Sequence, residues 1–410
     1  MKDQIVIHAT PLFDGKNIKE DKYVIIEENK VVDVIDEYIP YTYEGIVTPA
    51  FIDAHSHIGM IRYGEPESEE EGNDISGQIL PTNNPLNSIY FDDKAFEEAV
   101  DFGVLYSCVV PGSGNLMGGK AMIIKNFGKN RDEAFFKHYG YKMALGYNPR
   151  STLEWKGDRP NTRMGIYTLL EKKFEEVLIK REREKLKLEK TLLELERKLK
   201  DEEIDKSEYE KEREFAKREY ELEFDEEDKA ILELLDGKKT AKVHVHKADD
   251  VLYLIELVKK YNLKVTAEHL SDIKDIEIFE SLRENEIPVV YGPLGALPYK
   301  VELKNESYKN TKKLMDSGVF YGLMTDHPVV ISPQLRFELA YFLIHGAKEE
   351  DALSIITFRN AKILGIDDIL GTIEPGKLAS IVIWNDNPLK LSAYPQVVIA
   401  EGKIVRGYES

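Results

Sequence analysis

The sequence has almost no cysteine and no long apolar run. Cys108 is the single cysteine among 410 residues, so no intrachain disulfide can form and a reducing compartment is expected. No stretch approaches the roughly 18 consecutive apolar residues of a membrane-spanning helix. The N-terminal stretch "MKDQIVIHATPLF" also lacks such a segment. We therefore expect a cytoplasmic protein without a membrane partner.

Positive charge is also scarce. Lys and Arg number 56 against 75 Asp and Glu, which gives a formal net charge of −19. Because phosphate binding draws on clustered Lys and Arg, this balance argues against a nucleic-acid partner, and we expect a small-molecule substrate. Hydrophobic residues make up 42% and aromatic residues 10%, enough for a large folded core. The length suits one large α/β barrel with an accessory domain.

The two ends of the chain share a β-type pattern. "QIVIHATPLFDG" and "DKYVIIEENKVVDVIDE" alternate apolar and polar residues between turn residues, and so do "GKLASIVIWNDNP" and "PQVVIAEGKIVRG" near the C-terminus. This pattern predicts one small β-domain built from residues 1–47 and 371–410. The alternative is two unrelated hairpins at the edges of the protein.

Between these ends, residues 48–370 alternate β-type runs with helical stretches, as in a parallel sheet or barrel. The helical stretches include residues 249–262 and 333–346. The number of β-type runs is the eight that a TIM-type barrel needs. These runs are 48–55, 103–110, 120–127, 141–147, 241–246, 264–269, 287–291 and 319–325.

One segment, residues 171–230, interrupts this order. It is about two-thirds charged and contains no Gly or Pro. We expect two long helices that form an antiparallel hairpin protruding from the barrel, although heptads are not sustained well enough for a long coiled coil. The hairpin is either an arm for a partner or an oligomer, or a solvated excursion between the fourth and fifth strands. We expect a homo-oligomer.

Histidines gather at the ends of the expected strands. Scattered histidines would be surface or core residues, but strand ends in a barrel converge on one mouth, where barrel active sites lie. A further histidine, His327, directly follows Asp326 at the end of the eighth strand. The strand-end histidines are His55, His57, His244, His246 and His269.

This set of residues matches the needs of a divalent transition metal, which binds neutral imidazole nitrogens and carboxylate oxygens and keeps one position open. His55 and His57 are two residues apart, so they share one face of a strand. His244 and His269 add nitrogens, and Asp326 adds an oxygen. Asp326 would also take the proton of a metal-bound water, whose pKa the metal lowers.

Several motifs resemble the metal-dependent amidohydrolase superfamily. They are "PAFIDAHSH", "VHVHKADD", "AEHL", "YGLMTDHPV", "TFRNAKILGI" and "GTIEPGKLASIVIWNDNPL". The resemblance covers essentially the whole chain except the charged hairpin, and it is closest to the imidazolonepropionase-like branch, which has prolidase-like members. It implies a distorted (β/α)8 barrel with a small β-sandwich from both termini. It also implies hydrolysis of C–N bonds in amides, cyclic amides or amidines by attack of metal-bound hydroxide.

Mapped onto this sequence, the resemblance implies that His55 and His57 are the strand-one ligands. His244 and His269 match the ligands of strands five and six, and Asp326 matches the strand-eight ligand and general base. His246, one step beyond a ligand position, is expected to contact the substrate or stabilise the transition state. The alternative for His246 is a hydrogen-bonded residue at the rim.

The number of ions depends on the fourth strand. Two-metal members of the superfamily bridge their ions with a carboxylated Lys or a Glu, usually from this strand. Here the strand ends at Tyr147, which is not a bridging residue, while Lys142 would have to point inward and Lys120 is equally speculative. One ion is therefore favoured over two. Zinc is expected, with iron or manganese as alternatives.

The substrate pocket is less readable. Arg150 and Arg163 follow the fourth strand and would clamp a substrate carboxylate, or else pair with the acidic surface. Tyr147, Tyr291 and His327 are the other candidate substrate contacts. Rival functions on the same site are a heterocycle deaminase and a prolidase-like dipeptidase. A rival of another class is an inactive barrel that serves as a scaffold through its hairpin.

Overall fold

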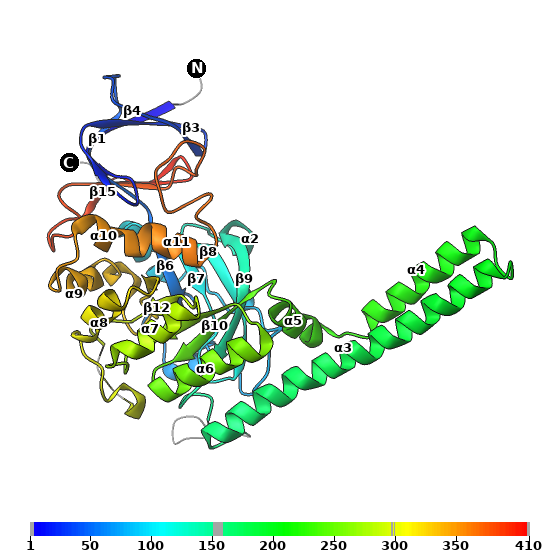
Figure 1. Cartoon of the computed structure of the whole chain (residues 1–410). Coiled ribbons are helices and arrows are strands. Elements are labelled where there is room, and N and C mark those ends of the chain that lie inside the picture. The colour runs from blue at the N-terminus through cyan, green and yellow to red at the C-terminus, as the bar shows by residue number, and fades with distance from the viewer. Residues whose placement is uncertain (1–3, 151–158, 297, 299, 408–410) are drawn as a thin grey trace.

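The computed structural model describes residues 4–150, 159–296, 298 and 300–407. It contains two eight-stranded sheets, one built from the chain ends and one from the middle. In Figure 1 the terminal sheet lies at one end of the barrel, and a long helical arm projects sideways. None of the helices within these ranges is long and apolar enough to cross a membrane.

The terminal sheet joins both ends of the chain. β5 (Tyr43–Pro49) pairs antiparallel with β14 (Ile381–Trp384), so the first and last strands are parts of one sheet rather than two separate hairpins. Its inward side chains form a hydrophobic core of their own, separate from that of the barrel. The remaining strands are β1 (Gln4–Phe13), β2 (Ile18–Lys19), β3 (Lys22–Glu27), β4 (Lys30–Ile35), β15 (Pro395–Ala400) and β16 (Lys403–Gly407).

The barrel sheet follows chain order, and each expected strand has a counterpart in it. This confirms the predicted distorted barrel. The strands are β6 (Phe51–Ser56), β7 (Val104–Val109), β8 (Met117–Lys125), β9 (Phe135–Ala144), β10 (Thr240–Val245), β11 (Val265–His269), β12 (Val289–Tyr291) and β13 (Tyr321–Leu323).

Helices surround this barrel (Figure 1). The α-helices other than the arm are α1 (Lys94–Asp101), α2 (Arg131–Ala134), α5 (Glu226–Leu235), α6 (Ala248–Tyr261), α7 (Ile276–Glu284), α8 (Asn310–Ser317), α9 (Ala340–Leu343), α10 (Glu349–Ser354) and α11 (Asn360–Ile363). Shorter helical segments are η1 (Glu67–Glu69), η2 (Pro85–Asn87), η3 (Val301–Leu303), η4 (Ser332–Gln334), η5 (Phe337–Leu339) and the π-helical η6 (Ile355–Arg359).

One strand runs against the expected direction. β8 pairs antiparallel with both β7 and β9, whereas the other pairs of the barrel sheet are parallel. The connection from β7 to β8 covers only residues 110–116 and holds no helix in the described chain. A parallel crossover needs about a dozen residues or more, so this short connection can only return the chain antiparallel. The expectation of an all-parallel barrel is therefore wrong at β8.

The barrel closes through side chains at the seam between β13 and β6, where the sheet's strand order ends. Asn360 Nδ2 donates to the carbonyl oxygens of Ile52 (2.6 Å) and Leu323 (2.8 Å), and its Oδ1 accepts from Leu323 N (3.0 Å). The approach is close, since a Cβ at Gly322 would lie 1.9 Å from Asn360 Oδ1. Asp53 adds a second bridge, accepting from Thr325 N at 3.1 Å.

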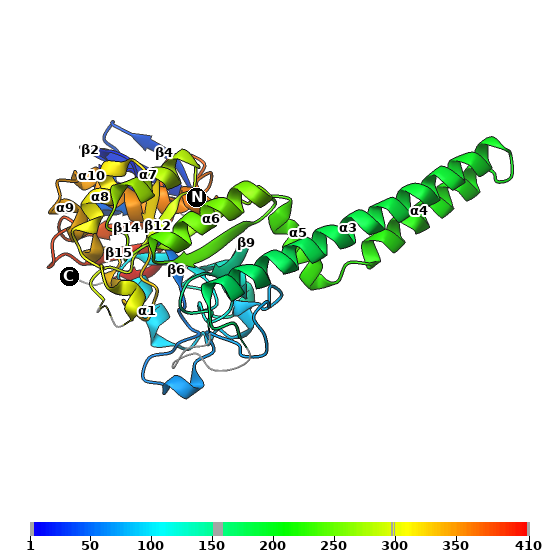
Figure 2. The same ribbon diagram turned by 60° about the horizontal axis from the view of Figure 1, so that its bottom comes forward.

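The arm consists of α3 (Arg163–Lys200) and α4 (Lys206–Leu222), which project away from the barrel in both views (Figures 1 and 2). α3 begins eight residues before the expected start of the hairpin, because Thr162 caps it by accepting from Gly165 N at 3.1 Å. The base of α3 buries Phe174 and Val177 in the barrel core. Lys180 and Asp228 of α5 form an ion pair of 2.6 Å where the arm leaves the body.

Replacing Asn360 with Ala should lower the free energy of unfolding by about 2 to 5 kcal/mol, because buried donors and acceptors on both seam strands lose their partner. Urea unfolding monitored by circular dichroism measures this loss. Asn29→Ala, in an exposed turn between β3 and β4, is the control and should change little. Equal stabilities for the two variants would contradict the closing role of Asn360.

Candidate active site

The predicted ligands meet at one mouth of the barrel. His57, His244, His246, His269 and Asp326 line a cavity of ≈ 250 Å³. His55, in β6, is fully buried beside it. Asp326 Oδ1 lies 3.1 Å from His57 Nε2 and 3.4 Å from His55 Nε2. Groups from β6, β10, β11 and the residues after β13 therefore reach one centre, as strand-end placement predicts.

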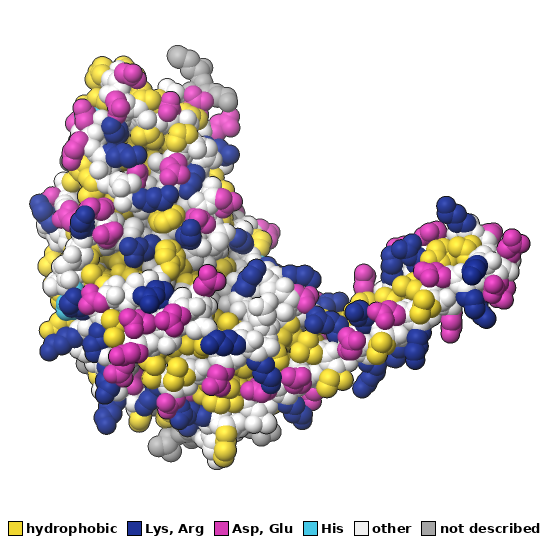
Figure 3. Space-filling view, in the orientation of Figure 1, with side chains coloured by type: hydrophobic (Ala, Val, Ile, Leu, Met, Phe, Trp, Pro, Cys, Tyr) yellow, Lys and Arg dark blue, Asp and Glu magenta, His cyan; other side chains and the backbone are white. Residues whose placement is uncertain are grey.

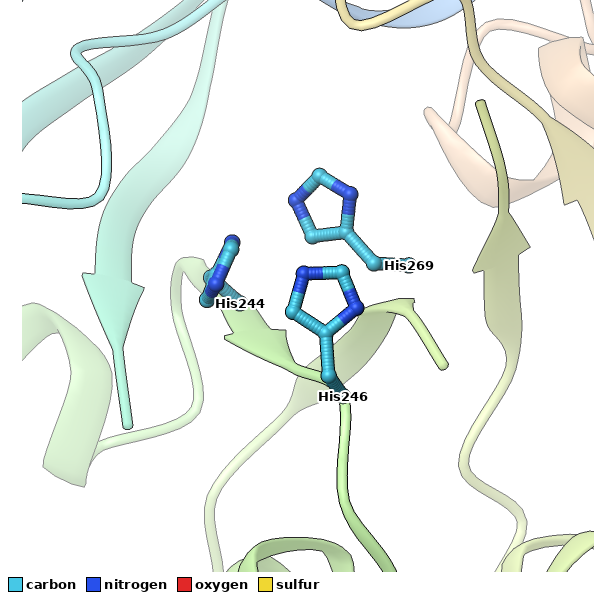
Figure 4. Close-up of side chains that lie close together, drawn as sticks. All are labelled: His244, His246 and His269. Atoms are coloured by element: carbon cyan, nitrogen blue, oxygen red, sulfur yellow. The ribbon is translucent and has the colours of Figure 1, made fainter. Parts of the chain in front are cut away.

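The histidines of β10 and β11 face one another (Figure 4). The ring centroids of His244 and His269 are 4.4 Å apart, and those of His244 and His246 are 4.7 Å apart. One ligand atom from each of these three residues lies within 4.8 Å of the others, and the same holds for His55, His269 and Asp326. His269 belongs to both groups, so the two sets of candidate ligands adjoin.

A left-handed backbone brings two of these side chains inward. His269 has φ of 75° and Asp326 has φ of 50°, which non-glycine residues rarely adopt. Along β11 successive side chains alternate, and Glu268 already points into the barrel, where it meets His55. The positive φ at the strand end turns His269 to the same interior. Such strain is typical of functional sites.

Three of the imidazoles are held by hydrogen bonds at Nδ1. His55 Nδ1 donates to Glu268 Oε2 (2.8 Å), His57 Nδ1 to the Val110 oxygen (2.7 Å), and His269 Nδ1 to the Gly292 oxygen (3.0 Å). In a neutral imidazole, such a bond leaves Nε2 as the unprotonated nitrogen. This is the second layer of contacts that metal-binding histidines usually have.

The remaining nitrogens fit a metal ion. Both ring nitrogens of His244, Nδ1 of His246 and Nε2 of His269 are buried and have no hydrogen-bond partner in the described chain. A buried polar atom without a partner costs about 1 to 3 kcal/mol, which a bound ion would offset. Burial lowers the pKa of His55, His244 and His246 well below the ordinary value and that of His269 to about 3. These imidazoles are therefore neutral, as ligation requires.

The acidic group of the site is ionised. Burial acts to raise the pKa of Asp326, but His269, His57 and Lys142 hold it below its ordinary range. His327 does not line the cavity. It is fully buried against the ring of Tyr63, at a centroid distance of 5.3 Å, and burial lowers its pKa to about 3.

Lys142 meets the condition for a bridging residue, because its side chain points inward. It is fully buried, and its Nζ lies 2.9 Å from His55 Nε2. Burial lowers its pKa to about 8. Lys120 pairs across the sheet with Tyr141, the neighbour of Lys142, so it lies on the other face. Lys120 is therefore not a bridging residue.

Charged groups continue below the mouth. Lys242 Nζ lies 3.0 Å from Glu268 Oε1, and both side chains are fully buried. Thr266 also donates to this carboxylate. Glu268 thus connects a buried lysine to His55 and orients this candidate ligand. Glu268 directly precedes His269 in the sequence. The alternation of side chains along a strand would place these two residues on opposite faces, so it does not predict that both point inward.

Three predicted substrate contacts lie elsewhere. Tyr147, Arg150 and Arg163 line a neighbouring hollow with Lys247, Asp249 and Asp250. Arg163 Nη1 lies 3.1 Å from Asp249 Oδ2, so its guanidinium pairs with an acidic side chain of α6, the alternative considered from the sequence. Tyr291 is also absent from the cavity wall. Its buried ring faces Phe279 of α7, at a centroid distance of 6.4 Å.

Other residues, which the sequence does not single out, form one wall of the histidine cavity. Lys300 Nζ donates to Asn148 Oδ1 (3.2 Å) and lies 3.3 Å from Glu302 Oε2, and Asn148 Nδ2 donates to Ser113 Oγ (2.6 Å). Lys300 is the only Lys or Arg among the described residues that line this cavity. These residues come from the loops after β7, β9 and β12, and no motif marks them.

The comparisons with known proteins agree with this geometry. The model of the amidohydrolase family matches residues 203–405. A solved amidohydrolase from Thermotoga maritima is 29% identical, and the match covers 98% of this chain and 100% of that one with a TM-score of 0.80. The chain belongs to the amidohydrolase superfamily. The resemblance found in its motifs is thereby confirmed.

Other relatives show the range of this superfamily. Amidohydrolase tasK of Hapsidospora irregularis is 24% identical over 90% of this chain and 37% of its own length. A 5-methylthioadenosine/S-adenosylhomocysteine deaminase of Caldanaerobacter subterraneus is 26% identical over 44% of this chain and 45% of its own length. The chain thus spans less than half the length of these curated relatives. A solved Xaa-Pro dipeptidase, 16% identical with a TM-score of 0.58 over 99% of this chain and all of that one, shows the same fold.

Proposed function

We propose that this chain is a metal-dependent hydrolase that cleaves a C–N bond of an amide, cyclic amide or amidine. The observation that carries the proposal is the convergence of buried, neutral imidazoles and one ionised carboxylate on a single cavity. Unpaired nitrogens of this kind are characteristic of a metal centre. Superfamily membership and the named amidohydrolase and deaminase relatives support the reaction class.

The metal would be held by His55, His57, His244, His269 and Asp326. Zinc is the first candidate, with iron or manganese as alternatives, because imidazole and carboxylate ligands suit all of them. When bound, such an ion polarises the scissile group and lowers the pKa of water.

The chain's own residues supply the proton transfers. Asp326, ionised and directed into the cavity, would accept a proton from the attacking water at its carboxylate and return it to the leaving nitrogen. His246, a neutral imidazole on the cavity wall, would donate a hydrogen bond to the oxygen on which negative charge develops. The enclosing wall of the cavity would hold the substrate against both groups.

Replacing Asp326 with Asn should lower kcat by about 10² to 10⁴-fold, since the amide cannot accept the proton. Steady-state hydrolysis of lactams, dipeptides and N-acyl amino acids, with metal content measured on the same samples, tests this expectation. Asp249→Asn, outside the cavity beside Arg163, is the control. A fully active D326N enzyme with its metal bound would remove Asp326 as the base.

The inward position of Lys142 favours two ions over the single ion expected from the sequence. Its neutral amine would add to carbon dioxide, forming an N–C bond and releasing a proton, to give a carbamate whose oxygens would be further ligand atoms. The side-chain nitrogen already lies against the ligand His55. His57 lies beside Asp326 and His244 lies beside His269, so the five proposed ligands include donors for two adjacent ions.

Wild-type protein should bind two equivalents of zinc and show a carbamate signal in ¹³C NMR after incubation with labelled bicarbonate. Lys142→Met should remove the signal and at least one equivalent of zinc. Lys120→Met, on the other face of the sheet, should behave as wild type. Saturation of the wild type at one equivalent, without a carbamate signal, would support the single-ion site instead.

The cavity wall bears on the substrate class. Lys300 presents a buried ammonium beside Asn148, and it lies close enough to His246 to lower that histidine's pKa in addition to the effect of burial. We propose that the substrate carries a carboxylate near the scissile bond and that Lys300 binds it. Lys300 thereby takes the role expected from the sequence for Arg150 and Arg163.

Lys300→Met should raise KM for a carboxylate-bearing substrate by about tenfold or more, the effect of losing one charged hydrogen bond. KM for the matching neutral amide of that substrate should not change. Lys304→Met, an exposed residue of the same loop, is the control. Equal losses on both substrates would mean that Lys300 has a structural role only.

A further inference from the structure

The arm has one face that neither the barrel nor α4 covers. The buried positions of α3 mark its covered face, and they are Ile166, Leu170, Phe174, Val177, Glu184 and Leu195. These spacings of three, four, seven and eleven residues correspond to one side of a helix. The opposite side of α3, beyond the point where it leaves the barrel, is open to solvent.

Three large apolar residues lie in a line on this open face. Ile179, Leu186 and Leu193 are 56%, 50% and 65% exposed. They are seven residues apart, which is close to two helical turns, so they form one stripe along α3. Leu186 is two residues from the buried Glu184, about half a turn, which places the stripe opposite the covered side.

Charged side chains of both signs lie along the arm (Figure 3). The helical spacing places a row of charges on each side of the stripe. Glu182, Glu189 and Glu196 lie on one side of the stripe, and Arg183, Lys190 and Arg197 lie on the other. Both rows repeat at the same interval of seven. Within the helix Glu189 contacts Lys185 at 3.8 Å, an exposed pair that contributes little to stability.

We propose that this stripe binds the same stripe of a second copy of the chain, with the two α3 helices parallel and in register. A two-fold axis along the helices turns each row to the opposite side, so the acidic row of one copy faces the basic row of the other. An antiparallel pair has its axis perpendicular to the helices and would bring acid against acid and base against base. The charge pattern therefore specifies the parallel dimer.

The contact is small, because each copy contributes only three apolar layers. Standard interfaces bury far more surface, so we expect dissociation in about the micromolar range rather than a permanent dimer. The barrels lie on the covered side of each α3, away from the stripe. The arms therefore meet without using the active-site cavity.

Sedimentation velocity on the full chain across micromolar concentrations should show a monomer–dimer equilibrium. Replacing Leu186 and Leu193 together with Glu should weaken it by at least about tenfold, because the apolar layers are lost. Leu222→Glu, on α4 and 73% exposed, is the matched control and should leave the dimer unchanged. Circular dichroism should show the same helix content in every variant.

Orientation is tested with Leu193→Cys. Cys108 is buried, so the introduced thiol is the only reactive one in the described chain. Parallel, in-register helices place the two copies of residue 193 together, and mild oxidation should yield a disulfide-linked dimer. In an antiparallel pair residue 193 would meet residue 179, and no cross-link should form.

Charge reversal tests the rows. Replacing Glu182, Glu189 and Glu196 with Lys should abolish self-association, and so should replacing Arg183, Lys190 and Arg197 with Glu. Mixing the two variants should restore a heterodimer. Three outcomes would overturn the proposal: a wild-type monomer at every concentration, a dimer that survives the Leu→Glu changes, or a Leu193→Cys dimer that fails to cross-link.

Discussion

The site depends on how the barrel closes. The last and first strands of the barrel sheet are joined by one amide side chain, Asn360, and by the bridge between Asp53 and Thr325. Directly beyond these bonds, Asp326 N donates to the His55 oxygen at 3.1 Å and His57 N donates to the His327 oxygen at 3.0 Å. Closing the seam therefore brings the Asp326 carboxylate, which follows the last strand β13, to His55 and His57 at the end of the first strand β6.

Burial has two consequences at this mouth. It lowers the pKa of His55, His244, His246 and His269, so these imidazoles are neutral. It also makes every unpaired nitrogen costly, so the same environment favours an ion at the candidate ligands. The charges that remain beneath them are paired. Glu268 is shared between Lys242 and His55, so the orientation of the His55 ring depends on a buried ion pair whose loss would leave a charge uncompensated.

The arm and the barrel obey different constraints. In the barrel, each functional side chain is placed by a strand end and by contacts from neighbouring strands. On the open face of α3, beyond Val177, the alignment of side chains follows from helix periodicity, since every seventh side chain returns to nearly the same line. The proposed chemistry and the proposed self-association would thus use separate parts of the molecule.

Local patterns in the chain were enough to predict the eight strands and the arrival of the histidines and Asp326 at one mouth. These features depend on the alternation of side chains within each strand and on the convergence of strand ends in a barrel, and both can be read from the strands individually.

Local periodicity could not show the direction of β8, since that depends on the length of one connection. It also could not show that Lys142 points inward or that Glu268 and His269 both do, because a left-handed residue breaks the alternation. Only the folded barrel shows that Lys300 lies in the cavity and Arg163 outside it. The position of a loop side chain depends on which loops lie next to one another once the barrel has closed.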